Sequence, residues 1–258
     1  MKTRSDKKIG VFIIPSLLTT ANLFCGFYSI IAVLKGDYVT AAFAIIVAML
    51  FDSFDGKIAR LTNSTSHFGV EYDSLSDLVS FGVAPGLLIY RWALNDYGKI
   101  GWLAVFLFVA CGAMRLARFN TQASDTGLKH FVGLPIPAAA GLIVTTVIFD
   151  HHILQMGRGV RPVVILLMTY VLAYLMVSTI PHRSFKETHL AERKPLSSLI
   201  GAVLILIIVV AEPQIMLFVM FLLYASSGVA ERLFAFVLQV MHKKSEVKVS
   251  GIAKSKDI

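Results

Sequence analysis

The chain has 258 residues, of which 56% are hydrophobic and 16% are charged, and its mean hydropathy is +0.73. Soluble domains carry about 25% charged residues, so the composition excludes an ordinary soluble protein and indicates an integral membrane protein. The net charge of +8 does not indicate a nucleic-acid partner, because the basic residues are distributed as membrane topology signals. The two cysteines, Cys25 and Cys111, lie in apolar segments and predict no disulfide framework.

Apolar stretches long enough to cross a bilayer, about 20 residues each, recur along the chain. They predict an all-α, polytopic membrane bundle of about eight transmembrane helices. Residues 1–14 are expected to form a cytoplasmic N-terminal segment, residues 15–240 the transmembrane domain and residues 241–258 a polar cytoplasmic tail. The expected helices are 15–34, 39–61, 72–94, 100–119, 135–149, 162–180, 196–211 and 215–240.

Lysine and arginine residues fall mainly on one side of this arrangement. With the N-terminus in the cytoplasm, most of the 24 basic residues lie in cytoplasmic segments. The outer segments then hold Lys35, Arg91, Lys99, Arg158 and Arg161. The positive-inside bias predicts that both termini are cytoplasmic, which an even number of helices satisfies. We therefore expect a protein of the cytoplasmic membrane.

The most polar stretch within this apolar chain is residues 52–77. It contains four aspartates, Asp52, Asp55, Asp73 and Asp77. The first two share one face of a helix, the last two share one face of the next helix, and a short polar link, 61–68, joins them. The four carboxyls are therefore expected to converge, at the cytoplasmic end of both helices. Converging anions repel one another, and hard oxygen ligands favour divalent cations. We expect two cations here, Mg²⁺ or Mn²⁺, with Ca²⁺ as a possible occupant.

Small and basic residues accompany the aspartates at fixed spacing. The stretch follows the pattern D-x2-D-G-x2-A-R-x8-G-x3-D-x3-D, in which the other four positions are Gly56, Ala59, Arg60 and Gly69. With this pattern the sequence resembles the CDP-alcohol phosphatidyltransferase family, over roughly the first 140 residues. The resemblance implies a helical membrane enzyme that transfers a phosphatidyl group from a CDP-lipid to an alcohol with the help of metal ions. It also implies a homodimer.

Flanking stretches carry the resemblance further. They are residues 15–27 (PSLLTTANLFCGF), 73–85 (DSLSDLVSFGVAP), 114–120 (MRLARFN) and 133–140 (GLPIPAAA). These stretches resemble the branch of the family that uses L-serine as the acceptor alcohol. The resemblance therefore implies CDP-diacylglycerol and L-serine as substrates, with membrane lipids around them and phosphatidylserine as the product.

Individual roles follow from the resemblance. Asp52, Asp55 and Asp73 would hold one cation, and Asp52, Asp73 and Asp77 the second. Asp77 would also be the general base that takes the proton of the acceptor hydroxyl. The CDP-lipid would bind at Thr19, Gly56, Ala59, Arg60, Ser66 and Gly69. Serine or a lipid phosphate would bind at Asn22, Arg115, Arg118 and Asn120, because guanidinium groups pair with either anion.

The residues by themselves leave alternatives open. The two motif glycines also suit close helix packing, Ser66 suits a helix cap, and Asn22 suits an interhelical hydrogen bond. The acceptor could equally be glycerol phosphate, inositol phosphate or choline, and the donor could carry ether-linked tails, as in archaea. A cation transporter is the alternative from another class. It predicts polar residues along a path through the membrane, whereas here they concentrate at one face.

Overall fold

The computed structural model describes residues 4–62, 66–125, 133–155, 160–180, 212–228 and 230–232. Among these residues every regular element is helical. The α-helices are α1 (Arg4–Leu34), α2 (Tyr38–Leu61), α3 (His67–Asp77), α4 (Ala84–Ile89), α5 (Gly98–Asp125), α6 (Ile136–Phe149) and α7 (Val160–Val177). π-Helical turns at Leu78–Val83 and Tyr90–Leu94 extend α3 and α4 into one rod, and a further π-helical turn, Asp150–Leu154, follows α6. One more helix, Pro213–Arg232, is described except for residue 229.

Five of these stretches are long and apolar enough to cross a membrane. They are Ile14–Leu34, Tyr38–Ala59, His67–Thr121, Ile136–Leu154 and Pro213–Arg232. The third contains two rods, which meet at Gly98, where φ is +50°. The predicted all-α membrane bundle is therefore confirmed, but the count of eight helices is not. The predicted helix 196–211 and the tail 241–258 lie outside the described residues.

Two helices begin more than two residues earlier than the sequence predicts. The first, expected from residue 15, begins at Arg4 and includes Pro15 in its interior. The third, expected from residue 72, begins at His67 because Ser66 caps it, with its Oγ accepting a hydrogen bond from the Gly69 N–H at 3.0 Å. Such a cap satisfies one of the backbone donors that a helix start leaves unpaired.

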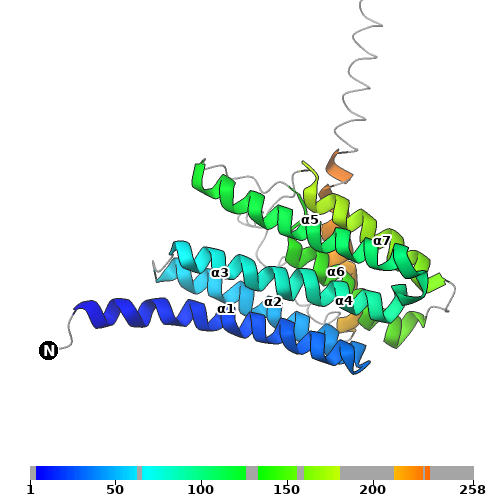
Figure 1. Cartoon of the computed structure of the whole chain (residues 1–258), viewed down its shortest axis with the longest axis horizontal. Helices are drawn as coiled ribbons and strands as arrows, with labels where there is room; N and C mark the ends of the chain where they lie inside the picture. Colours follow the sequence, from blue (N-terminus) through cyan, green and yellow to red (C-terminus); the bar gives the residue numbers. More distant parts are fainter. Residues whose placement is uncertain are drawn as a thin grey trace, which may run out of the picture.

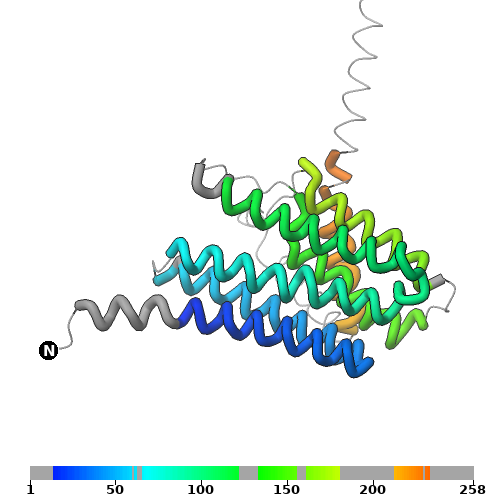
Figure 2. The backbone as a smooth tube through the Cα atoms, viewed as in Figure 1, coloured from blue at the N-terminus to red at the C-terminus, as the bar shows by residue number. Residues whose placement is uncertain are grey.

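The helices form a bundle with α6 at its centre (Figure 1). Helices α1 and α2 are antiparallel and joined by a turn in which Gly36 has a φ of +79°. The α3–α4 rod lies beside them, and α5 and α7 pack over that rod (Figure 2). Nearly every side chain of α6 is buried. The N-terminal part of α1, the α2–α3 junction and the end of α5 lie at the same end of the bundle (Figure 1).

Hydroxyl groups of the α3 rod dock it onto α1. Ser76 donates to the Thr19 carbonyl and Ser80 donates to the Asn22 carbonyl, each at 3.0 Å. Ser80 also lies directly against Gly26, where a Cβ atom would be 2.7 Å from the Ser80 Cα. Small residues that allow such close approach are typical of helix contacts in membranes. This contact fixes α1 in register with the helix that carries Asp73 and Asp77.

Replacing Gly26 by alanine tests this docking. The added methyl group meets backbone, which cannot rotate away, so we expect a loss of about 1–3 kcal/mol in stability and a lower midpoint of thermal unfolding in detergent. Phe27→Ala is the control, because the Phe27 side chain is 57% exposed on the same helix. An unchanged midpoint for Gly26→Ala would contradict the close approach.

Candidate metal and substrate site

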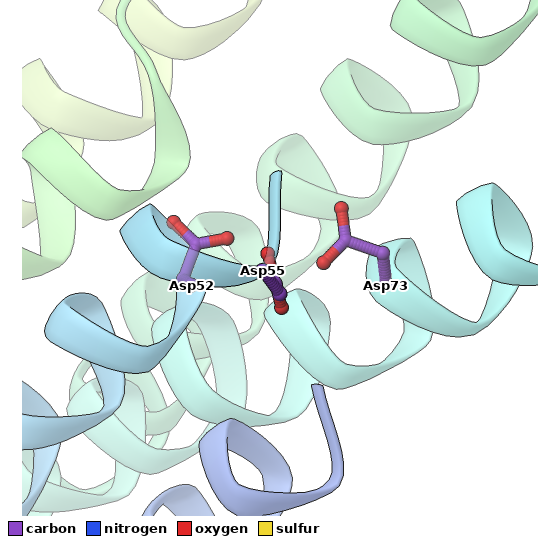
Figure 3. A group of neighbouring side chains, drawn as sticks. All are labelled: Asp52, Asp55 and Asp73. Carbon is purple, nitrogen blue, oxygen red and sulfur yellow. The ribbon is translucent and has the colours of Figure 1, made fainter. Parts of the chain in front are cut away.

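Three of the predicted aspartates meet between α2 and α3. Asp52 and Asp55 come from α2 and Asp73 from α3, and Figure 3 shows their carboxyls turned toward one another. One oxygen of each lies within 4.8 Å of the others. Asp77, the last residue of α3, is buried beside them and interacts electrostatically with all three. The structure thus brings three of the four predicted carboxyls together with Asp77 near them, and their role as metal ligands stays a prediction.

This cluster suits a divalent cation. Its donor atoms are all carboxylate oxygens, the ligands that Mg²⁺, Mn²⁺ and Ca²⁺ prefer. Two carboxylates about 5 Å apart repel by roughly 3 kcal/mol at an effective dielectric constant of about 20. Among the side chains that the structure describes, no Lys or Arg forms an ion pair with any of the four. Asp73 Oδ1 is buried without a hydrogen-bond partner. The residues present thus fit a cation that would complete their coordination.

Helix α1 supplies neutral donors to two of these carboxyls. Thr19 Oγ1 donates to Asp55 Oδ2 at 3.0 Å, and Asn22 Nδ2 donates to Asp77 Oδ1 at 3.1 Å. Thr19 is 5% exposed and Asn22 is fully buried. Each donor engages one oxygen of its carboxylate. Outer hydrogen bonds of this kind orient metal ligands in proteins. For Asn22, the interhelical alternative left open by the sequence is the one that the structure shows.

A cavity of about 200 Å³ opens on the Asp73 and Asp77 side of the cluster, and it is called the polar cavity here because five of its lining residues have charged or polar side chains. The residues that line it come from α3, α5 and the start of α6: Val70, Asp73, Ser74, Asp77, Arg115, Leu116, Phe119, Asn120, Pro135, Ile136 and Pro137. Its volume is that of a small solute rather than a lipid. It combines carboxylates on one wall with a guanidinium and an amide on the other.

Of the three binding residues predicted on α5, two line this cavity and one does not. Arg115 lines it, has a buried Nε without a hydrogen-bond partner and interacts electrostatically with Asp77. Asn120 also lines it, and its Nδ2 donates to Ser74 Oγ at 3.0 Å and to Glu71 Oε2 at 3.3 Å. Arg118, in contrast, is not among the lining residues.

A second cavity, of about 370 Å³, lies on the Asp52 side and is mostly apolar. Its walls come from α2, α6 and the Pro213–Arg232 helix, and the residues are Met49, Asp52, Ser53, Pro135, Pro137, Ala138, Met220, Phe221 and Tyr224. Pro135 and Pro137 line both cavities. The segment that carries these prolines therefore stands between a polar and an apolar compartment.

Gly133 positions this segment. Its φ is +86°, and a Cβ atom there would collide with the Met176 carbonyl at the end of α7. The N–H groups of Gly133 and Leu134 donate to the carbonyls of Ile180 and Leu175, each at 3.0 Å. A larger residue would be strained by its conformation and excluded by its neighbour. The GLPIP sequence thus ties the wall between the cavities to α7.

The remaining predicted residues lie near the α2–α3 junction. Gly56 directly follows Asp55 on α2, Ala59 lies one turn after Asp55, and both are half-buried. Ser66 and Gly69 form the α3 cap described above. The side chain of Arg60 lies outside the described residues. Sequence reasoning did not single out Ser74 or Tyr224. The spacing of Ser74 placed it next to a motif aspartate, whereas nothing local in the sequence connects Tyr224 with Asp52.

A family model and several known proteins match this chain in sequence. A family model described as CDP-alcohol phosphatidyltransferase matches residues 12–181. The chain is 36% identical over 235 residues to a CDP-diacylglycerol–serine O-phosphatidyltransferase of Helicobacter pylori, covering 90% of this chain and 96% of that protein. It is 38% identical over 179 residues to the protein of the same name from Bacillus subtilis, covering 69% and 94%. An archaetidylserine synthase of Methanothermobacter thermautotrophicus is 46% identical over 139 residues, covering 53% and 58%.

Binding of Mn²⁺ to the purified protein tests the cluster. We expect Asp52→Asn or Asp73→Asn to weaken Mn²⁺ binding more than about 100-fold, and Thr19→Val, which removes only the bond to Asp55, by about tenfold. Calorimetric titration or electron paramagnetic resonance measures both.

The matched control is Asp37→Asn, since Asp37 is an exposed aspartate at the opposite end of α2. Wild-type affinity in Asp52→Asn and Asp73→Asn would show that the cluster holds no cation.

Proposed function

The chain belongs to the CDP-alcohol phosphatidyltransferase family, and on that premise we propose that it transfers the phosphatidyl group of CDP-diacylglycerol to the hydroxyl of L-serine. CMP leaves and phosphatidylserine forms. The relatives named above support the reaction and the acceptor. The observation that carries the proposal is the placement of the carboxylate cluster between a polar cavity and an apolar one. The proposed donor is a lipid, which matches the apolar cavity, and the proposed acceptor is a small polar alcohol, which matches the polar one.

We propose that the carboxylates hold two divalent cations, one by Asp52, Asp55 and Asp73 and one by Asp52, Asp73 and Asp77. The family is in general metal-dependent. Mg²⁺ or Mn²⁺ would supply charge neutralisation of the pyrophosphate and of the departing CMP oxygen. The role of the chain itself is to hold the carboxyls together against their repulsion, which the Thr19 and Asn22 hydrogen bonds support.

Asp77 is the proposed general base. Asn22 donates to its Oδ1 and so orients the carboxyl in the polar cavity that Asp77 lines. The hydroxyl proton of serine passes to the Asp77 carboxylate while the hydroxyl oxygen attacks the phosphorus that carries the diacylglycerol. The bond from that phosphorus to CMP breaks, and CMP takes the electron pair. Because Asp77 is held in one orientation, the base and the nucleophile are positioned for reaction before proton transfer begins.

Arg115 is the proposed partner of the serine carboxylate. Its guanidinium lines the polar cavity with donor capacity unused, and a guanidinium pairs with a carboxylate through two parallel hydrogen bonds. Asn120 and Ser74, which are hydrogen-bonded to each other, form the neighbouring wall. An acceptor held between Arg115 and Asp77 presents its hydroxyl toward the cluster. The cavity volume of about 200 Å³ suits serine.

The CDP part of the donor is assigned to the α2–α3 junction. Gly56, Ala59 and Gly69 offer backbone unobstructed by large side chains, and Arg60 would pair with a phosphate. Thr19, predicted to bind the CDP-lipid, also orients Asp55 through its hydrogen bond. For the linkage of the donor's tails, the ester of CDP-diacylglycerol is the first candidate. The likeness to an archaetidylserine synthase supports an ether-linked donor as the second candidate.

The chain is an integral membrane protein by its apolar helices. We propose that it lies in the cytoplasmic membrane with both termini in the cytoplasm, as the distribution of basic residues supports. The site then faces the cytoplasm, where serine and CMP are soluble. A homodimer is proposed from the family resemblance, and residues 15–240 are proposed as the catalytic transmembrane domain between cytoplasmic termini.

CMP release from CDP-diacylglycerol tests the base. With Mn²⁺ and L-serine present, we expect Asp77→Asn to lower turnover by about 10²–10⁴-fold while CDP-diacylglycerol still binds, because the loss falls on proton transfer. A chelator should stop the wild-type reaction. Asp37→Asn is again the control. Full turnover in Asp77→Asn would refute the base assignment.

Arg115→Ala tests the acceptor site. We expect the KM for L-serine to rise about 10- to 100-fold, the cost of one charge-assisted interaction, with little change in the KM for the donor. Arg118→Ala, three residues away on the same helix and outside the polar cavity, should have a much smaller effect. CMP release with glycerol phosphate, inositol phosphate or choline, and not with serine, would keep the metal chemistry and reject serine.

A further inference from the structure

We propose that the Pro213–Arg232 helix forms the selective wall of the donor-lipid site, with Phe221 and Tyr224 contacting the glycerol backbone and the first carbons of the lipid tails. The inference rests on the proposed function, since it takes the donor to be a CDP-linked lipid. It assigns a role in lipid recognition to a helix that lies beyond residues 12–181, where the family model matches.

The first observation is that this helix is docked on α6 at defined positions. The Phe221 ring lies against Gly141, in the space that a Cβ atom would occupy there. Phe218 stacks on Phe149, with ring centroids 4.7 Å apart and planes 8° apart. An aromatic ring in place of a missing side chain fixes both the depth and the rotation of the helix. The Pro213–Arg232 helix is thus held against the buried centre of the bundle.

The second observation is what this docking brings to the carboxylate cluster. Met220, Phe221 and Tyr224 line the apolar cavity that also contains Asp52. Asp52 is the single charged residue among its lining residues. A cavity that is lined by one carboxylate of the cluster and otherwise mostly by apolar side chains matches a ligand with a charged head and an apolar body. Its volume of about 370 Å³ corresponds to roughly a dozen water-sized groups, which is enough for the glycerol region but not for two whole tails.

Tyr224 connects this wall with the acceptor side. It is half-buried and lies near Arg115, which lines the polar cavity. One residue of the Pro213–Arg232 helix therefore lies near both proposed substrate sites. Its amphipathic side chain suits a position where the apolar tail region of a lipid changes to its polar head.

The test measures donor binding separately from turnover. Full-length wild type, Phe221→Ala and Tyr224→Leu are titrated with CDP-diacylglycerol, with its ether-linked counterpart and with CDP alone, in detergent with Mn²⁺. We expect both variants to bind CDP-diacylglycerol roughly 5- to 20-fold more weakly, since apolar contact is lost. The preference between ester- and ether-linked donors should shift, and the affinity for CDP should stay within about twofold. Leu223→Ala is the control, because Leu223 is 63% exposed on the same helix.

Each outcome is decisive. Wild-type affinity of Phe221→Ala and Tyr224→Leu for both lipid donors would overturn the inference, as would an equal loss of affinity for CDP, which would indicate general damage to the site. Failure of the wild type to bind CDP-diacylglycerol would overturn it as well. If the binding differences appear but no alcohol supports CMP release, the proposed reaction fails while the lipid wall stands.

Discussion

Mutual repulsion of carboxylates is the constraint on which the arrangement of this bundle depends. Four aspartates are held together in a protein whose helices are otherwise apolar, and each close pair costs several kcal/mol unless a cation joins it. Helices α2 and α3 carry the charges, but α1 holds them in place. It supplies an uncharged donor to Asp55 and another to Asp77. Neutral donors leave the net negative charge of the cluster intact, so its attraction for a divalent cation is preserved.

The contact between α1 and the α3 rod explains how uncharged donors reach the carboxyls. Thr19 and Asn22 each donate through a side chain to an aspartate and accept through a backbone carbonyl from a serine of that rod. Gly26 continues the same line of contact against Ser80. The π-helical turn Leu78–Val83 contains Ser80 and precedes Pro85, whose ring cannot continue the regular hydrogen-bond ladder. A widened turn directly after Asp77 thus belongs to the docking of the two helices.

Local pattern was sufficient to predict the cluster and insufficient to predict its surroundings. The i, i+3 and i, i+4 spacing places Asp52, Asp55, Asp73 and Asp77 correctly because it depends only on helix periodicity. The cap at Ser66 was an open alternative, and the start of α3 was misplaced because the polar residues before Tyr72 resemble a loop.

Contacts between distant segments cannot be predicted in this way. The hydrogen bond from Asn22 to Asp77 and the presence of Tyr224 and Asp52 in the lining of one cavity depend on how helices pack, which no local spacing encodes. The number of spans was uncertain for the same reason, since α7 is short and α6 is buried by its neighbours rather than by lipid.

The depth of the cluster along its helices suits a reaction between a lipid and a water-soluble alcohol. Asp52 lies nine residues before the end of α2 at Leu61, about 14 Å along the axis at 1.5 Å per residue. Asp73 lies six residues after the start of α3 at His67, about 9 Å along the axis. The polar headgroup layer is about 5–8 Å thick on each side of the hydrocarbon core.

With the α2–α3 junction emerging into the cytoplasm, as the basic residues predict, the carboxyls lie near the boundary between headgroups and hydrocarbon. The phosphorus of a membrane-embedded CDP-lipid lies close to this depth, so the donor can react without leaving the bilayer. Serine has only to enter the polar cavity from the same face.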